Sequence, residues 1–216
     1  MSSFLNFPKL IKGGLVLADP ASGAIKRVIT LQYNPDSISR TLQAKTVGQD
    51  TADRSEALRL KGPAVETIKL EAEIDATDQL EAADPQATEV GIHPQLAALE
   101  TILHPASADL LANNALAQSG TLEIIPMEAP LTLFVWSKNR VVPVRLTEFS
   151  ITEEAFDVAL NPIRAKVSLG MRVLSVDDFG FDQLGGSLFM THLQQKERLA
   201  ARNPPGALGA LGIGGI

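Results

Sequence analysis

The chain has 216 residues, a formal net charge of −6 and a hydrophobic content of 45%, and it contains no cysteine. These values fit one β-rich domain with an appendage, or two small domains, and they exclude a disulfide framework and a thiolate metal site. The negative net charge argues against a general binder of nucleic-acid backbones, because such a protein needs clustered positive charge.

No stretch of the sequence approaches the roughly 18 consecutive apolar residues of a membrane helix. The first residues lack the basic start and long apolar run of a signal peptide, so we expect no secretion signal. These features, with the absence of cysteine, fit a protein of the cytoplasm that does not insert directly into a membrane.

The chain begins with a predicted β-hairpin, because residues 13–17 and 25–33 are strand-like runs on either side of a turn-rich linker. The second run ends at Asn34 and Pro35, since proline cannot continue a strand ladder and restricts the residue before it. Residues 36–63 show no strong period and are rich in polar groups. Two interpretations of this segment stay open: a binding surface and a flexible region.

A strand is predicted at residues 65–76, where apolar and polar residues alternate. The apolar face consists of Ile68, Leu70, Ala72 and Ile74, and the other face of Thr67, Lys69, Glu71, Glu73 and Asp75. Residues 78–90, which are acidic and rich in alanine, predict a loop.

Two helices are expected next. Pro94 suits the first turn of a helix that ends at His104 and Pro105. Ser107 is a candidate cap for a second, short helix that ends at Gly120. The apolar residues of the two helices are Leu96, Leu99, Ile102 and Leu103 in the first, and Leu110, Leu111 and Leu116 in the second. A short strand is predicted at residues 122–125.

The predicted core is three antiparallel strands within residues 131–176. The first, at 131–137, is apolar on both faces, which indicates a central strand covered from two sides. The last, at 163–176, alternates with period two and therefore has one buried and one polar face.

The middle strand, at residues 140–151, changes phase within its length. Val142, Val144 and Leu146 occupy even positions, whereas Phe149 and Ile151 occupy odd positions. A shift of one residue inside a strand is typical of a β-bulge, which we place near Thr147 and Glu148.

The C-terminal part, residues 177–216, is expected to lie outside the β domain of residues 1–176. Residues 177–180 break the sheet, residues 187–202 predict a helix, and residues 203–216 form an apolar tail rich in glycine. Such a tail lacks the residues to fold alone but can become ordered against a partner.

No recognisable enzyme site is present in the sequence. His93, His104 and His192 are the only histidines, and no nucleophile motif accompanies them. The acidic pairs at 153–154 and 177–178 fall at predicted strand ends, where solvated turns are expected rather than metal ligands. No phosphate-binding glycine loop and no zinc or calcium motif occurs, so we expect no cofactor.

The polar face of the last predicted strand is more informative. Arg164, Lys166 and Arg172 share this face, which is unusually regular for so long a strand. It is either an ordinary solvent face or a surface that lines a pore or contacts a neighbouring subunit, and composition does not choose between these.

Five segments resemble, in family order, the tube-domain proteins of contractile injection systems. They are LQYNPDSISR at 31–40, GIHPQLAALE at 91–100, FVW at 134–136 with VVPVRL at 141–146, SITEEAFD at 150–157 and LNPIRA at 160–165. No one segment is diagnostic, but together they span most of the predicted β domain.

The resemblance implies a mainly β (α+β) fold: an antiparallel two-sheet, tail-tube-like β-sandwich or barrel with one or two short helices. It also implies a structural baseplate protein that forms a hexameric ring, adapts the trimeric spike or hub to the inner tube, and initiates the tube. Its partners would be further copies of itself, the spike, the inner tube protein and other baseplate proteins, with no nucleic acid. The protein would occupy the bacterial cytoplasm during assembly and then the particle.

Many relatives in that family add a C-terminal LysM module, which binds peptidoglycan. Residues 177–216 show no LysM pattern, so this activity is not carried over. A glycan-binding or peptidoglycan-binding module of the particle is the alternative function, and a hydrolase is a third.

The residues expected to contact other subunits fall in three groups. They are Tyr33, Asn34, Pro35 and Arg40 in the first matching segment, Arg164 and Arg172 on the polar strand face, and Leu208, Leu211 and Ile213 in the tail.

Overall fold

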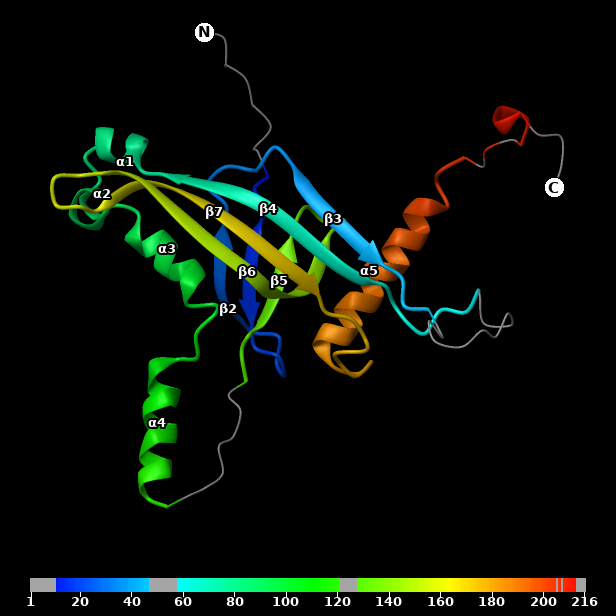
Figure 1. The fold of residues 1–216 in the computed structure, drawn as a ribbon, viewed down its shortest axis with the longest axis horizontal. Coiled ribbons are helices and arrows are strands. Elements are labelled where there is room, and N and C mark those ends of the chain that lie inside the picture. Colours follow the sequence, from blue (N-terminus) through cyan, green and yellow to red (C-terminus); the bar gives the residue numbers. More distant parts are fainter. Residues whose placement is uncertain (1–10, 47–57, 121–127, 205, 207, 213–216) are drawn as a thin grey trace, which may run out of the picture.

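The computed structural model describes residues 11–46, 58–120, 128–204, 206 and 208–212. Within these residues the fold is mainly β, with helices around a sheet of seven antiparallel strands in the order β2-β1-β5-β6-β7-β4-β3 (Figure 1). The strands are β1 (Gly14–Ala18), β2 (Ile25–Thr30), β3 (Ile38–Gln43), β4 (Val65–Asp75), β5 (Leu131–Val135), β6 (Val141–Phe156) and β7 (Pro162–Val173). The helices are α1 (Thr77–Glu81), α2 (Pro85–Val90), α3 (His93–Glu100), α4 (Ser107–Gln118), α5 (Leu184–Ala200) and a 3-10 turn, η2 (Leu208–Leu211).

The mainly β, antiparallel class predicted from the sequence is therefore confirmed. The described strands hydrogen bond in a single sheet rather than in two. Strand β6 makes the sheet continuous, because its first residues, 141–144, pair with β5 and residues 144–156 pair with β7. Because β6 is long enough to pair with β5 and then with β7, the strands form one curled sheet instead of the two sheets of a sandwich.

The curl brings distant strands together. The side chain of Gln32, just after β2, donates to the carbonyl of Asp75 at 2.6 Å and accepts from the Asp75 amide at 2.9 Å. Asp75 ends β4, which lies near the other side of the sheet. The sheet therefore approaches closure at this end, while β2 and β3 remain its two edge strands.

The core lies inside this curl, and the alternation of β4 and β7 fills it. On β7, Val167 is 0% exposed and Leu169 is 1% exposed, as the period of two predicts. These pair with Ala72 and Leu70 of β4, which are also buried. Helix α3 adds Leu96 and Leu99 to the same cluster.

The phase change in the middle strand is confirmed as a bulge. The pairing of β6 with β7 shifts register between Leu146 and Glu148, where the sequence placed it. The predicted N-terminal hairpin is also confirmed, as β1 and β2.

The prediction of a loop at residues 78–90 is wrong, because this segment contains most of α1 and all of α2. Asp84 caps α2 by accepting from the amide of Ala87 at 2.9 Å, and Pro85 occupies its first turn. Helices of five and six residues are too short to show an apolar period, and only α2 carried a start signal, Asp84 followed by Pro85.

The irregular segment predicted at residues 36–63 contains a strand, β3, that the sequence analysis missed. All but two of the six β3 residues are exposed, and the two are only partly buried, so β3 lacks the alternating pattern of a half-buried strand. Residues 47–57, and the short strand predicted at 122–125, lie outside the described residues.

Helix α4 stands away from the sheet (Figure 1) and buries none of its residues. Leu110, Leu111 and Leu116 are all exposed on it. The predicted cap by Ser107 is wrong, because Ala106 is the N-cap and Ser107 is already helical. In the described part of the chain, no helix is long and apolar enough to cross a membrane.

The predicted C-terminal helix is confirmed as α5, which begins three residues earlier than expected. It packs against β6 and buries Phe189 and His192. The tail continues into η2, while Ile213 lies outside the described residues. The division into two domains at residue 176 stays a prediction.

Replacing Val167 with Asp is expected to prevent folding. The new carboxylate would be buried without a partner, at a cost of several kcal/mol against a typical stability of about 5–15 kcal/mol. The matched control is Ser168→Asp, one residue along on the exposed face. Circular dichroism and thermal melting of both variants test this, and a natively folded Val167→Asp protein would show that the core face is wrongly assigned.

Candidate functional site

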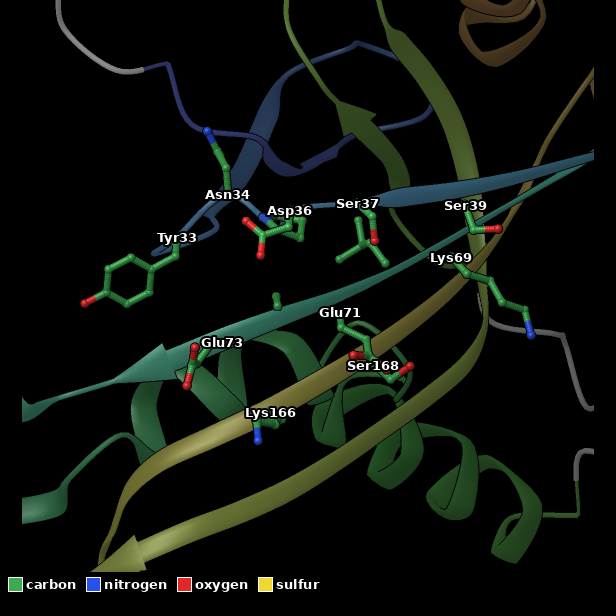
Figure 2. A pocket seen from close by; sticks show the side chains of 13 residues that line it. Tyr33, Asn34, Asp36, Ser37, Ser39, Lys69, Glu71, Glu73, Lys166 and Ser168 are labelled. Atoms are coloured by element: carbon green, nitrogen blue, oxygen red, sulfur yellow. The ribbon is translucent and has the colours of Figure 1, made fainter.

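An open groove of about 810 Å³ lies between the chain that follows β2 and the polar face of β4 and β7 (Figure 2). Tyr33, Asn34 and Pro35, three of the residues expected at an interface, line it together. The remaining polar lining residues are Asp36, Ser37, Ser39, Lys69, Glu71, Glu73, Lys166 and Ser168. Of these, the sequence pointed only to Lys166, on the polar face of the last predicted strand.

Asn34 positions one wall of the groove. Its side-chain oxygen accepts from the amide of Gly13 at 3.0 Å, and its side-chain nitrogen donates to the carbonyl of Ile11 at 2.9 Å. These bonds fasten residues 33–39 to the start of β1. Asn34 is thus committed within the chain, whereas Tyr33 is 47% exposed beside it.

The groove is acidic because its two lysines pair with carboxylates outside it, whereas its three carboxylates form no ion pair with another described residue. Lys69 pairs with Glu148 at 2.7 Å, and Lys166 pairs with Glu154 at 3.1 Å. Asp36 comes from the upper wall in Figure 2, and Glu71 and Glu73 come from β4. Chemically, such a groove can hold the basic side chains of a partner protein.

The structure does not bring the predicted arginines into this groove. Arg164 pairs with Asp75 at 2.7 Å, and Arg172 donates to both carboxylate oxygens of Asp178 at 2.9 and 3.1 Å. Both arginines therefore have ion-pair partners within the chain. These pairs alone can account for an arginine at positions 164 and 172. An additional role in assembly stays a prediction.

Arg40 lies on the opposite, inner face of the sheet, where it takes part in a buried ion cluster. Glu66 at the start of β4 accepts from Arg40 Nε at 2.7 Å and from Lys196 Nζ of α5 at 2.8 Å. The Glu66 side chain is only 7% exposed. This cluster joins the edge strand β3, strand β4 and helix α5, so Arg40 has a structural role here.

The surroundings of the cluster set two pKa values. Burial alone would raise the pKa of Glu66, but the hydrogen bonds from Lys196 and Arg40 outweigh it and hold that pKa below its ordinary 4.5. Burial, together with the nearby charge of Lys196, lowers the pKa of His192 to about 4. His192 is therefore neutral at physiological pH, and its Nδ1 has no hydrogen-bond partner among the described residues.

The tail residues are not gathered with the groove residues in any described contact. Leu208 and Leu211 bound η2, and Leu211 is 75% exposed. Within the described residues, no group of three histidine, aspartate or glutamate side chains is arranged to hold a metal ion.

Comparison with known proteins gives little further guidance. No protein family and no curated protein matches the chain. Among solved structures it is similar to a chain in the tail of an empty GTA particle with C6 symmetry, at 14% identity and a TM-score of 0.29, over 75% of this chain and 90% of the other. At this TM-score the likeness establishes neither fold nor function.

Replacing Glu66 with Gln is expected to destabilise the protein at neutral pH by roughly 1.5–3 kcal/mol, the usual worth of hydrogen bonds to a charged group. The folded-state pKa of Glu66 is lowered, so its contribution is fully present above pH 4.5 and is lost as the pH falls through the folded value. The difference in melting temperature between wild type and variant should therefore shrink in acid.

The matched control is Glu148→Gln, because Glu148 forms an exposed pair with Lys69. It should change the melting temperature little at any pH. An equal effect of the two substitutions, or a Glu66→Gln effect that does not depend on pH, would contradict the buried-cluster interpretation.

Proposed function

We propose that this protein is a structural ring-forming subunit of a phage-tail-like contractile injection particle. In this role it connects the trimeric spike to the hexameric inner tube and starts tube assembly, acting mechanically rather than as an enzyme. The observation that carries the proposal is that β2 and β3 each have a strand partner on one side only among the described residues, at the two edges of a curled sheet. The resemblance of five ordered segments to tube-domain proteins supplies the kind of particle.

The free edges favour pairing between copies. Strands β2 and β3 end the sheet on its two sides, and each presents an apolar side chain to solvent, Val28 at 56% and Leu42 at 54% exposure. An exposed edge strand is a template for a strand from another chain, and closure is the arrangement that removes edges altogether. When β2 of one copy pairs with β3 of the next, the backbone N–H and C=O groups of each edge strand bond to those of the other. Repeated around a closed ring, this pairing leaves no edge strand without a partner.

The acidic groove supports the same lateral contact. It lies against β3, since Ser39 of that strand lines it, and its carboxylates Glu71 and Glu73 belong to the adjacent strand β4. A neighbouring copy docked along β3 would place its own side chains over this groove. Basic groups there would be attracted to the groove, which would fix the register of the contact.

Lysine at both edges should prevent ring formation without unfolding the subunit. In the double variant Val28→Lys, Leu42→Lys, the charges would oppose edge pairing, as edge lysines do in natural sheets. Both positions are exposed, so the unfolding free energy should change by less than about 0.5 kcal/mol per site. Native mass spectrometry should give a hexamer for wild type and a monomer for the variant.

The matched control is Leu111→Lys in α4, which replaces an even more exposed leucine away from both edges and should leave the hexamer intact. A double edge variant that still forms hexamers would contradict the lateral contact. The role in the particle is tested by micrographs of a strain that lacks the gene. Normal, full-length sheathed tubes in that strain would contradict the adaptor role.

A further inference from the structure

Helix α5 carries a buried histidine on the face that it turns to the sheet. Gly185, Phe189, His192 and Lys196 follow one another at steps of three or four residues, so they form one stripe along the helix. His192 is only 5% exposed, whereas the chain's other two histidines, at positions 93 and 104, are exposed. His192 therefore sits in the contact between α5 and the sheet.

The hydrogen bonding around His192 favours its neutral form. Its Nδ1 atom is buried and has no hydrogen-bond partner in the described part of the chain. A protonated imidazole carries an N–H on both nitrogens, so protonation in place would leave a buried donor without an acceptor. The docked helix thus accommodates the neutral ring and not the cation.

Charged groups from four parts of the chain act on His192 as well. Lys196 on α5, Arg40 on β3 and Arg140 just before β6 bring positive charge, and Glu66 on β4 brings the one negative charge among these described groups. Glu66 is already engaged in ion pairs with Lys196 and Arg40. A proton on His192 would bring a fourth positive charge to a buried site with one carboxylate. Burial, and then the charge of Lys196, therefore lower the pKa of His192 to about 4.

Acid weakens the attachment of α5 through both of its titratable groups. As the pH falls below the ordinary pKa of 6.5, an undocked His192 takes up a proton that the docked one does not, so docking is progressively disfavoured down to about pH 4. The pKa of Glu66 in the folded protein lies below 4.5, so stronger acid also removes the charge that holds Lys196. The two effects have the same sign, and His192 acts first.

The strands keep a core of their own when α5 leaves. Among the described residues, the buried apolar cluster takes one member, Phe189, from α5, and the others come from the strands, α2, α3 and the segments beside them. Two polar contacts add to the attachment: Gln195 Nε2 donates to Asn139 Oδ1 at 3.0 Å, and Lys196 Nζ donates to Glu66 at 2.8 Å. An element with so little buried apolar surface can open while the rest of the protein stays folded.

We propose that α5 is an acid-sensitive clasp, which is docked on the sheet at neutral pH and is released in mild acid by protonation of His192, while the sheet stays folded. Release uncovers Phe189 and the part of the sheet beneath it, a surface that is covered at neutral pH. The clasp is a property of the single subunit and does not rest on the proposed role in a particle.

Hydrogen–deuterium exchange of the full-length protein at pH 7 and pH 5 tests the clasp, with each rate corrected for the intrinsic effect of pH. The protection of the α5 amides should fall by roughly ten- to twenty-fold between the two pH values, as expected for a histidine whose pKa is lowered from 6.5 to about 4. The amides of β7, in the middle of the core, should keep their protection. Loss of protection in α5 and β7 together would overturn the proposal.

His192→Phe replaces the titratable ring with an apolar ring that suits a buried position. In this variant the protection of α5 should change by less than about two-fold between pH 7 and pH 5, because the group that takes up the proton is gone. The matched control is His93→Phe, which removes an exposed histidine on α3 and should retain the wild-type fall. An equal fall in the His192→Phe protein and in wild type would also overturn the proposal.

A second variant leaves the buried ring in place. Arg140 is partly exposed, and Arg140→Gln removes one of the cations that act on His192. It should raise the pKa of His192 in an NMR titration of the three histidine rings and reduce the acid-induced loss of α5 protection. Lys138→Gln, at an exposed position in the same turn, should change neither. A His192 ring that titrates together with the two exposed histidines in wild type would contradict the clasp.

Discussion

The sheet of this protein curls towards a barrel without closing, and the rest of the structure depends on that constraint. The bulge in β6 and the length of that strand allow it to pair first with β5 and then with β7, so both halves of the sheet enclose one core. At one end Gln32 bridges the remaining gap to Asp75. Elsewhere in the described structure the gap stays open, so β2 and β3 each pair on one side only, and the acidic groove lies beside β3.

Several charged side chains at the sheet ends form ion pairs within the subunit. Arg40 and Lys196 neutralise the buried Glu66, Arg164 is held by Asp75, and Arg172 by Asp178. These pairs fix α5 and the strand ends. Exposed apolar side chains are also present, among them Val28 and Leu42 at the sheet edges and Leu111 on α4.

The sequence predicted the parts of the fold in which burial alternates. The period of two located β4 and β7, and the change of phase located the bulge between Leu146 and Glu148. The sequence pattern could not locate β3, because an edge strand exposed on both faces shows no alternation. It could not locate α1 and α2 either, because both are shorter than two helical turns. The single-sheet topology could not be predicted from the sequence either, because alternation does not specify which strands pair.

The candidate site was predicted only in part, for a related reason. Tyr33, Asn34 and Pro35 were found through their resemblance to a known motif, while Glu71 and Glu73 were recognised only as a polar strand face. The sequence does not show ion partners such as Glu66, which lies 26 positions from Arg40, or Asp75, which lies 89 positions from Arg164. A role of Arg40, Arg164 and Arg172 at an interface stays a prediction.

Hydrogen–deuterium exchange at the sheet edges tests the central claim most directly. Backbone amides of β2 and β3 that point away from the sheet should exchange quickly in the dissociated subunit and become protected in the assembled protein, because edge pairing converts them into ladder hydrogen bonds. Protection of both edges together is the result expected of a ring closed by strand pairing. Equally fast exchange at both edges in the assembled and the dissociated protein would contradict the account.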